Sequence, residues 1–255
     1  MSTVAHENNH HDEHHHEESF VSKYIFSQDH KMIGKQFLMT AVFMGIVAMM
    51  LSIFFRIQLA WPGEESTFLN TFLGDNWAPG GIMKENMYLG LVTIHGTIMV
   101  FFLLTGGLSG TFSNLLIPLQ LGARDMASGF LNMLSYWFFF ISTLLMFSSL
   151  FVYDGGLFGI QLGDAAAPLA EHTAWDGSGP AMSGWTIYPP LSGLPNAEQG
   201  SGLGMTLWLF SMGIFIASSL LGSLNYIVTV INLRTKGMKM TRMPLTIWAF
   251  FVTAI

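Results

Sequence analysis

The sequence predicts an all-α, polytopic transmembrane helix bundle, and two observations lead to this class. Charged residues make up 10% of the chain and apolar residues 51%, including 22 Phe and 18 Met, whereas a soluble domain carries roughly 25% charged residues. Apolar stretches recur that are long enough for a helix to cross a hydrocarbon core of roughly 30 Å, which takes about 20 residues. We therefore expect five spans to begin within these residues.

The first 18 residues, MSTVAHENNHHDEHHHEE, are polar and rich in histidine. They lack the apolar core of a signal peptide. Such a tract can capture metal ions, but its composition favours a solvated tail. We interpret residues 1–25 as a mobile, His-rich cytoplasmic tail that precedes a transmembrane domain of residues 26–255.

Four segments meet the length of a membrane span, at residues 35–57, 88–118, 130–153 and 205–233. A fifth, at 244–255, opens with Pro244, a residue suited to the first position of a helix. The sequence stops inside this apolar segment, so we expect the complete protein to continue.

The basic residues divide eight to two between the sides of the membrane. Because cytoplasmic loops are enriched in Lys and Arg, the N-terminus is predicted to be cytoplasmic and the long loop after the third span to face outward. The net charge of −6 says little, but the lack of a basic cluster argues against a nucleic-acid partner. The eight inner residues are Lys23, Lys31, Lys35, Arg124, Arg234, Lys236, Lys239 and Arg242, and the two outer ones are Arg56 and Lys84.

His95 is the strongest candidate for a functional residue within a span. The chain has no cysteine, so metal chemistry must use histidine, carboxylates or a cofactor. His95 lies about 10 Å below the outer end of the second span, and its neighbours, VTIHGTIMVFF, offer no acidic partner. Ionisable residues in a membrane are usually functional, and an imidazole is a ready haem ligand. The alternative is a histidine hydrogen-bonded to a carbonyl of another helix.

Other polar residues have a functional and a structural interpretation. Arg56, with Ser52 one turn away, can donate to a buried cofactor or reach to the interface. Asp125, in the inner loop GARDMASG, can begin a polar path, or it is a solvated acid that caps the third span. The remaining side chains can line a water chain or join helices: Asn114, Asn132, Ser135, Ser218, Ser219 and Asn225.

Six strings, in this order, resemble subunit I of the haem–copper oxidases: DHKMIG, FFRIQLAWPG, LVTIHGTIMVFF, NLLIPLQLGARDMA, GWTIYPPLSG and SSLLGSLNYIVTVINLR. The similarity extends from about Asp29 to Ile255. It implies a bundle of about a dozen helices in the complete subunit. It also implies a respiratory terminal oxidase, in which electrons from cytochrome c reach haem a and a haem–copper centre reduces oxygen to water while protons are pumped.

The resemblance implies roles for residues at both ends of the bundle. His95 becomes an axial ligand of the low-spin haem a, with Arg56 and Ser52 beside the formyl edge of that haem. Trp185 and Tyr188 become residues over the haem propionates.

Towards the cytoplasm, the resemblance makes Asp125 the mouth of the proton-conducting D-channel. Asn114 and Asn132 would then form its lower constriction. The side chains above that constriction would be Ser135, Ser218, Ser219 and Asn225.

The sequence departs from the family pattern at three places. Phe37 stands where the family usually has a tyrosine near the base of the first helix. Gln58 replaces an acid that binds a calcium or sodium ion, which puts that ion site in doubt. Arg124 places a positive charge directly before Asp125.

The second ligand of haem a, the ligand of haem a3 and the copper ligands are expected beyond Ile255, so no catalytic residue is expected within these residues. The implied partners are oxidase subunits II and III, cytochrome c or a membrane cytochrome donor, a respiratory supercomplex and the lipid bilayer of the cell inner membrane.

Three alternatives remain open at this point. A quinol oxidase shares the same subunit, and nothing here separates it from a cytochrome c oxidase. A nitric oxide reductase is a relative, but the set Asp125, Asn114 and Asn132 argues against it. A polytopic transporter or scaffold, in which His95 is merely packed, would show no haem absorption.

Overall fold

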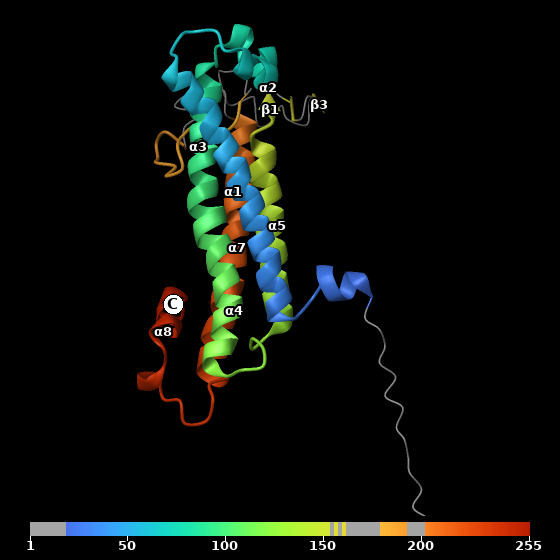
Figure 1. Cartoon of the computed structure of the whole chain (residues 1–255), viewed down its shortest axis with the longest axis vertical. Coiled ribbons are helices and arrows are strands. Elements are labelled where there is room, and N and C mark those ends of the chain that lie inside the picture. Colours follow the sequence, from blue (N-terminus) through green and yellow to red (C-terminus); the bar gives the residue numbers. More distant parts are fainter. Residues whose placement is uncertain (1–18, 154–155, 158–159, 162–178, 193–201) are drawn as a thin grey trace, which may run out of the picture.

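The computed structural model describes residues 19–153, 156–157, 160–161, 179–192 and 202–255. Long helices run side by side along the length of the molecule (Figure 1). Among the described residues, four helices are long and apolar enough to cross a membrane, which confirms the predicted polytopic helical class. They are α1 (His30–Ala60), the continuous helix α3–η3–α4 (Glu85–Thr97, Ile98–Leu108, Ser109–Leu121), α5 (Gly129–Ser149) and α7 (Gly202–Asn232).

The ends of two spans differ from the sequence prediction. Helix α1 begins at His30, five residues earlier than predicted, because Asp29 caps it by accepting a hydrogen bond from the Lys31 N–H at 3.2 Å. Helix α5 ends at Ser149 rather than at residue 153, because its last turn tightens: the Leu150 N–H donates to the carbonyl of Phe147. The polar first turn of α1 delays the start of the apolar stretch, and the tightened last turn of α5 leaves hydropathy unchanged, so apolar length alone misses both.

The second span is wound as a π-helix in its middle third, η3. Within it, the Thr105 hydroxyl donates to the carbonyl of Val100, five residues back, at 2.8 Å. Gly106 lies against the rings of Phe139 and Phe215, where a Cβ atom would approach within 2.8 Å of both. The wide winding and the missing side chain let α5 and α7 approach this helix closely, as small residues do in membrane bundles.

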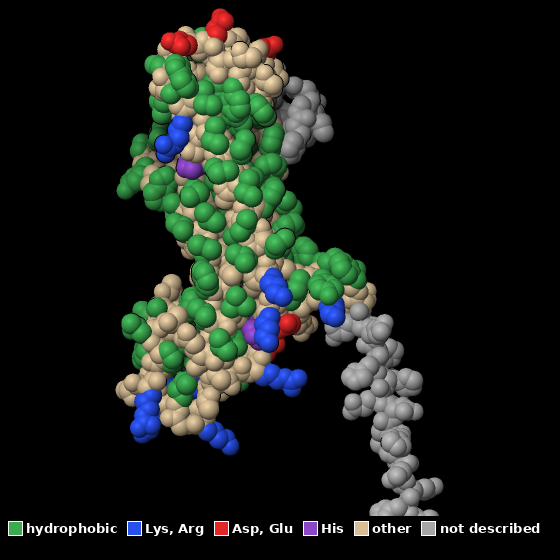
Figure 2. All heavy atoms as spheres, viewed as in Figure 1, with side chains coloured by type: hydrophobic (Ala, Val, Ile, Leu, Met, Phe, Trp, Pro, Cys, Tyr) green, Lys and Arg blue, Asp and Glu red, His purple; other side chains and the backbone are tan. Residues whose placement is uncertain are grey.

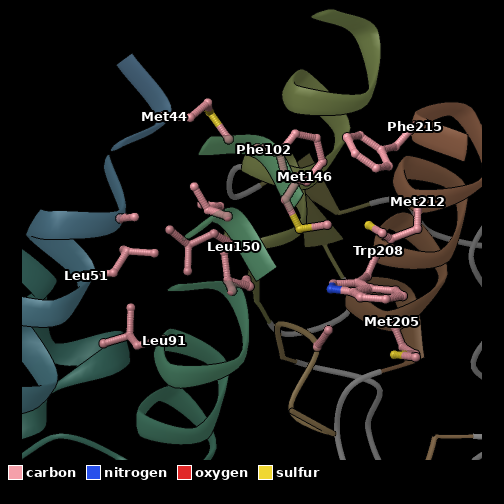
Figure 3. Close-up of a cluster of buried hydrophobic side chains, with 14 of the residues drawn as sticks. Met44, Leu51, Leu91, Phe102, Met146, Leu150, Met205, Trp208, Met212 and Phe215 are labelled. Carbon is pink, nitrogen blue, oxygen red and sulfur yellow. The ribbon is translucent and has the colours of Figure 1, made fainter. Parts of the chain in front are cut away.

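The core lies between the spans and is packed from buried apolar side chains (Figure 3). Hydrogen bonds between helices accompany this packing. The Trp208 indole N–H of α7 donates to the Thr97 hydroxyl of α3 at 3.1 Å. One turn further along α7, the Ser211 hydroxyl donates to the carbonyl of Ser142 on α5 at 2.7 Å. Because lipid offers no hydrogen bonds, such contacts join helices that hydrophobic packing alone would not fix in register.

The two ends of the bundle carry different structures (Figure 1). One end holds α2 (Thr67–Trp77), η2 (Pro79–Gly81) and a small antiparallel sheet of two-residue strands, β1 (Val152–Tyr153), β2 (Gly156–Leu157) and β3 (Ile160–Gln161). The opposite end holds η1 (Val21–Ile25), η5 (Met240–Arg242) and the short helix α8 (Leu245–Thr253), which packs against α4 and α7.

The charges also separate by end. Figure 2 shows acidic side chains gathered at the end that holds α2, and Lys and Arg side chains mostly at the end where α1 begins. Of the predicted tail, residues 1–18 lie outside the described residues. The part that follows is attached to α1, because the Gln36 amide donates to the carbonyls of Tyr24 and Ile25 at 2.7 and 3.0 Å.

Candidate functional site

His95 combines a fixed orientation with one free nitrogen. Its Nδ1 lies 2.8 Å from the carbonyl oxygen of Ala48 on α1, and its ring makes an edge contact with Phe55 at 5.5 Å between centroids. Among the described residues, Nε2 has no hydrogen-bond partner. The predicted carbonyl partner is therefore present, and it leaves the other nitrogen available, which is the usual arrangement of a metal-ligating histidine.

His95 opens onto a groove of about 500 Å³ between α1 and the second span. This volume lies within the range of roughly 300–1,000 Å³ that is typical of cofactor and small-molecule sites. The lining is apolar apart from His95 and Ser52: Val42, Gly45, Ile46, Met49, Ser52, Ile53, His95, Met99 and Leu103.

Arg56 and Ser52 lie together as predicted. The Arg56 Nε–H donates to the Ser52 hydroxyl at 3.0 Å, and Ser52 lines the same groove as His95. The serine thus places a guanidinium at the edge of the groove.

Of the two aromatic residues predicted above His95, the structure brings one to it. The Trp185 side chain packs on Gly96, where an added Cβ atom would lie 3.0 Å from Trp185 Cδ1. The backbone N–H of Gly184 donates to the Thr93 hydroxyl at 3.0 Å and anchors this loop on α3. Tyr188 is 71% exposed, and none of its described contacts reaches His95.

The Gln58 side chain is hydrogen-bonded to the backbone of another segment. Its side-chain carbonyl accepts a hydrogen bond from the Met83 N–H at 2.8 Å. The oxygen that would stand in for the acid of an ion site is thus directed at the backbone of the segment between α1 and α3.

Asp125 lies in the loop between α4 and α5, against His30. Its Oδ1 is 3.0 Å from His30 Nδ1 and accepts a hydrogen bond from the Met126 N–H at 2.7 Å. Within the described part of the chain, the Asp125 carboxylate contacts the His30 imidazole and makes no salt bridge with Arg124. The N-cap of α5 is Ser128, whose side chain accepts from the Leu131 N–H, so the interpretation of Asp125 as that cap is wrong.

His30 is a member of this site that the sequence patterns did not reveal. It is buried, and it also lies 3.4 Å from Asp29 Oδ1. The ligand atoms of Asp29, His30 and Asp125 lie within 4.8 Å of one another, close enough to hold a metal ion. The signal was the string DHKMIG, which shows a histidine beside an acid but not its distant partner Asp125.

Asn114 and Asn132 form a buried pair between α4 and α5. The Asn132 amide N–H donates to Asn114 Oδ1 at 2.5 Å, and the Asn114 amide donates to the carbonyl of Gly110 at 2.7 Å. Asn132 Oδ1 and Asn225 Nδ2 are buried without a partner among the described residues. Buried polar atoms are normally hydrogen-bonded, and water is the usual partner where protein offers none.

The serines continue from the asparagine pair along the interface of α5 and α7. The Ser135 hydroxyl donates to the carbonyl of Asn132, and the Ser218 hydroxyl donates to the carbonyl of Ser135, both at 2.7 Å. Ser135, Ser218 and Ser219 line a cavity of about 100 Å³, to which Phe37 also contributes.

The placement of Asn225 above the asparagine pair is wrong. Its side-chain oxygen accepts a hydrogen bond from the Ser128 N–H at 2.9 Å, one turn before Asn132 on α5. Because α7 runs antiparallel to α5, residues that follow Ser218 lie progressively nearer the end of the bundle that holds Asp125. Asn225 therefore belongs with the constriction rather than with the serines.

The fold and these residues define a class. The chain is a multi-pass helical membrane protein with a free imidazole nitrogen in a groove and a row of polar side chains that runs along the bundle from Asp125 to Ser218. Residues 32–255 match the family described as Cytochrome C and Quinol oxidase polypeptide I. The chain belongs to this family, the subunit I of haem–copper oxidases, whose members are membrane oxidoreductases of electron transport that bind haem and copper.

Named relatives agree with this membership. The chain is 38% identical over 240 residues to the alternative cytochrome c oxidase subunit 1 of Bradyrhizobium diazoefficiens, covering 93% of this chain and 33% of the relative. It is 32% identical over 247 residues to cytochrome c oxidase subunit 1 of Cereibacter sphaeroides, covering 92% and 39%. A putative cytochrome c oxidase subunit 1-beta of Streptomyces avermitilis is 33% identical over 232 residues, covering 91% and 33%. The chain thus spans about a third of the length of these relatives.

Proposed function

We propose that this chain is part of the catalytic subunit of a respiratory terminal oxidase that takes electrons from cytochrome c, reduces oxygen to water and pumps protons. The names of the relatives support cytochrome c as the donor, while the family description also includes quinol oxidases. The other oxidase subunits, II and III, and a membrane cytochrome or supercomplex are the partners proposed with it.

The observation that carries the proposal is the arrangement of His95. Its Nδ1 donates to the carbonyl of Ala48 at 2.8 Å, which directs the lone pair of the neutral imidazole to Nε2. His95 lines a groove of about 500 Å³ whose other lining residues are almost all apolar. The residues present therefore fit a low-spin haem a, which His95 would hold as an axial ligand through Nε2. When bound, such a haem accepts and passes on single electrons.

Arg56 and Trp185 are proposed to define the edges of the haem site. The Arg56 guanidinium, held by Ser52 at 3.0 Å, can donate a hydrogen bond to an acceptor on the haem periphery. Trp185, packed on Gly96 beside His95, can cover the outer side of the site and donate through its indole N–H. Tyr188 is proposed for the same outer region by family resemblance.

The second proposed role is proton uptake. Asp125 is half-exposed at the end of the bundle rich in Lys and Arg, and His30 lies 3.0 Å from it. The two side chains form a carboxylate–imidazole pair that can exchange a proton with solvent. The side-chain amide atoms of Asn132 and Asn225 that lack a protein partner among the described residues can bind water molecules. These waters would continue the proton path past the Asn114–Asn132 pair.

The serines carry this path further into the bundle. Ser135 and Ser218 both use their hydroxyl protons on backbone carbonyls. Each serine oxygen therefore keeps its lone pairs for water. The cavity of about 100 Å³ that they line with Ser219 has room for several waters, since one water needs roughly 10–15 Å³ of such space.

The charge distribution supports the proposed orientation. Eight of the ten Lys and Arg residues lie at the end of the bundle that holds Asp125, and the positive-inside rule assigns that end to the cytoplasm. We propose that the chain lies in the cell inner membrane with a cytoplasmic N-terminus, so that Asp125 draws protons from the cytoplasm.

The experiment that tests this function uses the complete oxidase, purified with all its subunits. We expect haem absorption with a low-spin component and rapid oxygen consumption with reduced cytochrome c. Faster turnover with a quinol would assign the alternative donor. A purified protein without haem absorption would contradict the proposal and favour a transporter or scaffold.

A further inference from the structure

Tyr226 is a phenol on the wall of the serine-lined cavity, and neither the haem site nor the uptake path described above uses it. The residue lies on α7, one turn beyond Gly222, and lines the cavity of about 100 Å³ together with Phe37, Ser135 and Ser218. Phe37 offers this wall no hydrogen bond. A chain of water molecules in the cavity therefore depends on the hydroxyl groups of the other lining residues.

The Tyr226 hydroxyl is held by Ser113, a fully buried residue of α4. The Ser113 hydroxyl lies 2.7 Å from the Tyr226 oxygen and 3.2 Å from the carbonyl of Gly110. It has one proton and can donate to one of them at a time. When Ser113 donates to Tyr226, the phenolic O–H has no acceptor among the described residues and is free for water in the cavity.

The same pair has a second arrangement. When Ser113 donates to Gly110, Tyr226 can donate to Ser113 and present its oxygen lone pairs to the cavity. A chain of water molecules that conducts protons needs a hydroxyl group that can both donate and accept. The reason is that each proton transfer reverses the direction of the hydrogen bonds along the chain.

The position of the pair places it between the two parts of the proposed path. Ser113 precedes Asn114 of the buried asparagine pair on α4, and Tyr226 follows Asn225 on α7. The pair is thus level with the constriction, and the cavity that Tyr226 lines extends to Ser135 and to Ser218, about two turns earlier on α7.

We propose that Tyr226, oriented by Ser113, is a positioning residue. Its hydroxyl group holds by hydrogen bonds the water molecules through which protons move from the Asn114–Asn132 pair to Ser135 and Ser218. This inference rests on the proposed uptake of protons at Asp125. Tyr226 exchanges no net proton in this role, since its hydroxyl reorients and the proton moves through water.

The test compares variants of the complete oxidase by the rate of proton uptake during oxygen reduction, measured in H₂O and D₂O. Tyr226→Phe keeps the ring and removes the hydroxyl. We expect proton-coupled steps to slow about three- to tenfold, the rate equivalent of one lost hydrogen bond, with a larger solvent isotope effect and an unchanged rate of low-spin haem reduction. Ser113→Ala is expected to change both quantities in the same direction by a smaller factor.

Tyr136→Phe is the matched control. Tyr136 is a phenol on α5 whose hydroxyl pairs with Thr40 at 3.2 Å, and it is not among the residues that line the cavity. We expect this variant to match the wild type. Equal slowing in Tyr136→Phe and Tyr226→Phe would show a general packing effect and overturn the inference.

The outcomes separate this inference from the function on which it rests. Slow uptake in Asp125→Asn with wild-type rates and isotope effects in both Tyr226→Phe and Ser113→Ala leaves the uptake path standing and refutes the role of Tyr226. Wild-type uptake in Asp125→Asn refutes the path itself, and the role of Tyr226 with it. If Tyr226→Phe does not assemble, the isotope effect of Ser113→Ala decides.

Discussion

Replacing Asp125 with asparagine perturbs the proposed proton path while leaving the local fold nearly unchanged. The asparagine keeps an oxygen for the Met126 N–H, which Asp125 now binds at 2.7 Å. What is lost is the carboxylate that faces His30 at 3.0 Å and its exchangeable proton. Because the Asp125 side chain is 43% exposed, the lost contact with His30 costs at most about 0–1 kcal/mol of stability.

The effect on turnover is expected to be far larger than the effect on stability. A positioned group that transfers a proton accelerates a step by about 10²–10⁴-fold. We expect oxygen consumption of Asp125→Asn to fall about 100-fold, which corresponds to about 2.7 kcal/mol in activation free energy. Haem content and the rate of low-spin haem reduction should remain those of the wild type, since Asp125 lies in the loop between α4 and α5 and none of its described contacts reaches His95.

The assay is oxygen consumption and proton-pumping stoichiometry of the complete oxidase in liposomes. Asp75→Asn is a suitable control, because Asp75 is an exposed acid on α2 at the other end of the bundle. Normal respiration and pumping in Asp125→Asn would refute the uptake role, and so would an equal loss in Asp75→Asn.

Three other predictions concern the haem site, the first outer loop and the start of α5. His95→Leu is expected to abolish the low-spin haem spectrum, because leucine cannot ligate iron, and an unchanged spectrum would make His95 a packing residue. Gln58 is already bound to the Met83 N–H at 2.8 Å, so we expect metal analysis to find no tightly held calcium there; a calcium ion with oxygens at about 2.3–2.6 Å would count against this. Ser128→Ala removes the N-cap of α5 and is expected to lower stability by about 1 kcal/mol, seen as earlier thermal inactivation; no shift in that temperature would contradict it.

The membrane spans were predictable because their signal is local. Apolar length identified the four helices that are long enough to span a membrane, whereas the fifth predicted segment holds only the nine-residue helix α8 within the described residues. The separation of basic residues agrees with the two ends of the bundle (Figure 2). The π-helical winding of η3 could not be predicted, because it depends on how Gly106 meets Phe139 and Phe215 on other helices. The string TGGL shows that close packing is allowed there, but not which helix provides it.

The sequence singled out most residues of the candidate site but not His30, and it predicted few of the contacts between them. The contact between Arg56 and Ser52 followed from their spacing of four residues on one helix. The contacts of Asp125 with His30 and of His95 with Ala48 join residues from different helices. No periodicity connects such residues, and a backbone carbonyl such as that of Ala48 leaves no trace in residue type. Asn225 was misplaced because its level depends on the antiparallel register of α5 and α7.

The most direct test of the proposed haem site is a map of the complete oxidase at a resolution that shows the haem iron and its ligands. We predict a haem in the groove between α1 and the second span, with iron bound to His95 Nε2 while Nδ1 keeps its hydrogen bond to the carbonyl of Ala48. A groove filled by lipid or by another helix, with Nε2 of His95 bonded to protein and the haem iron held elsewhere, would contradict this prediction.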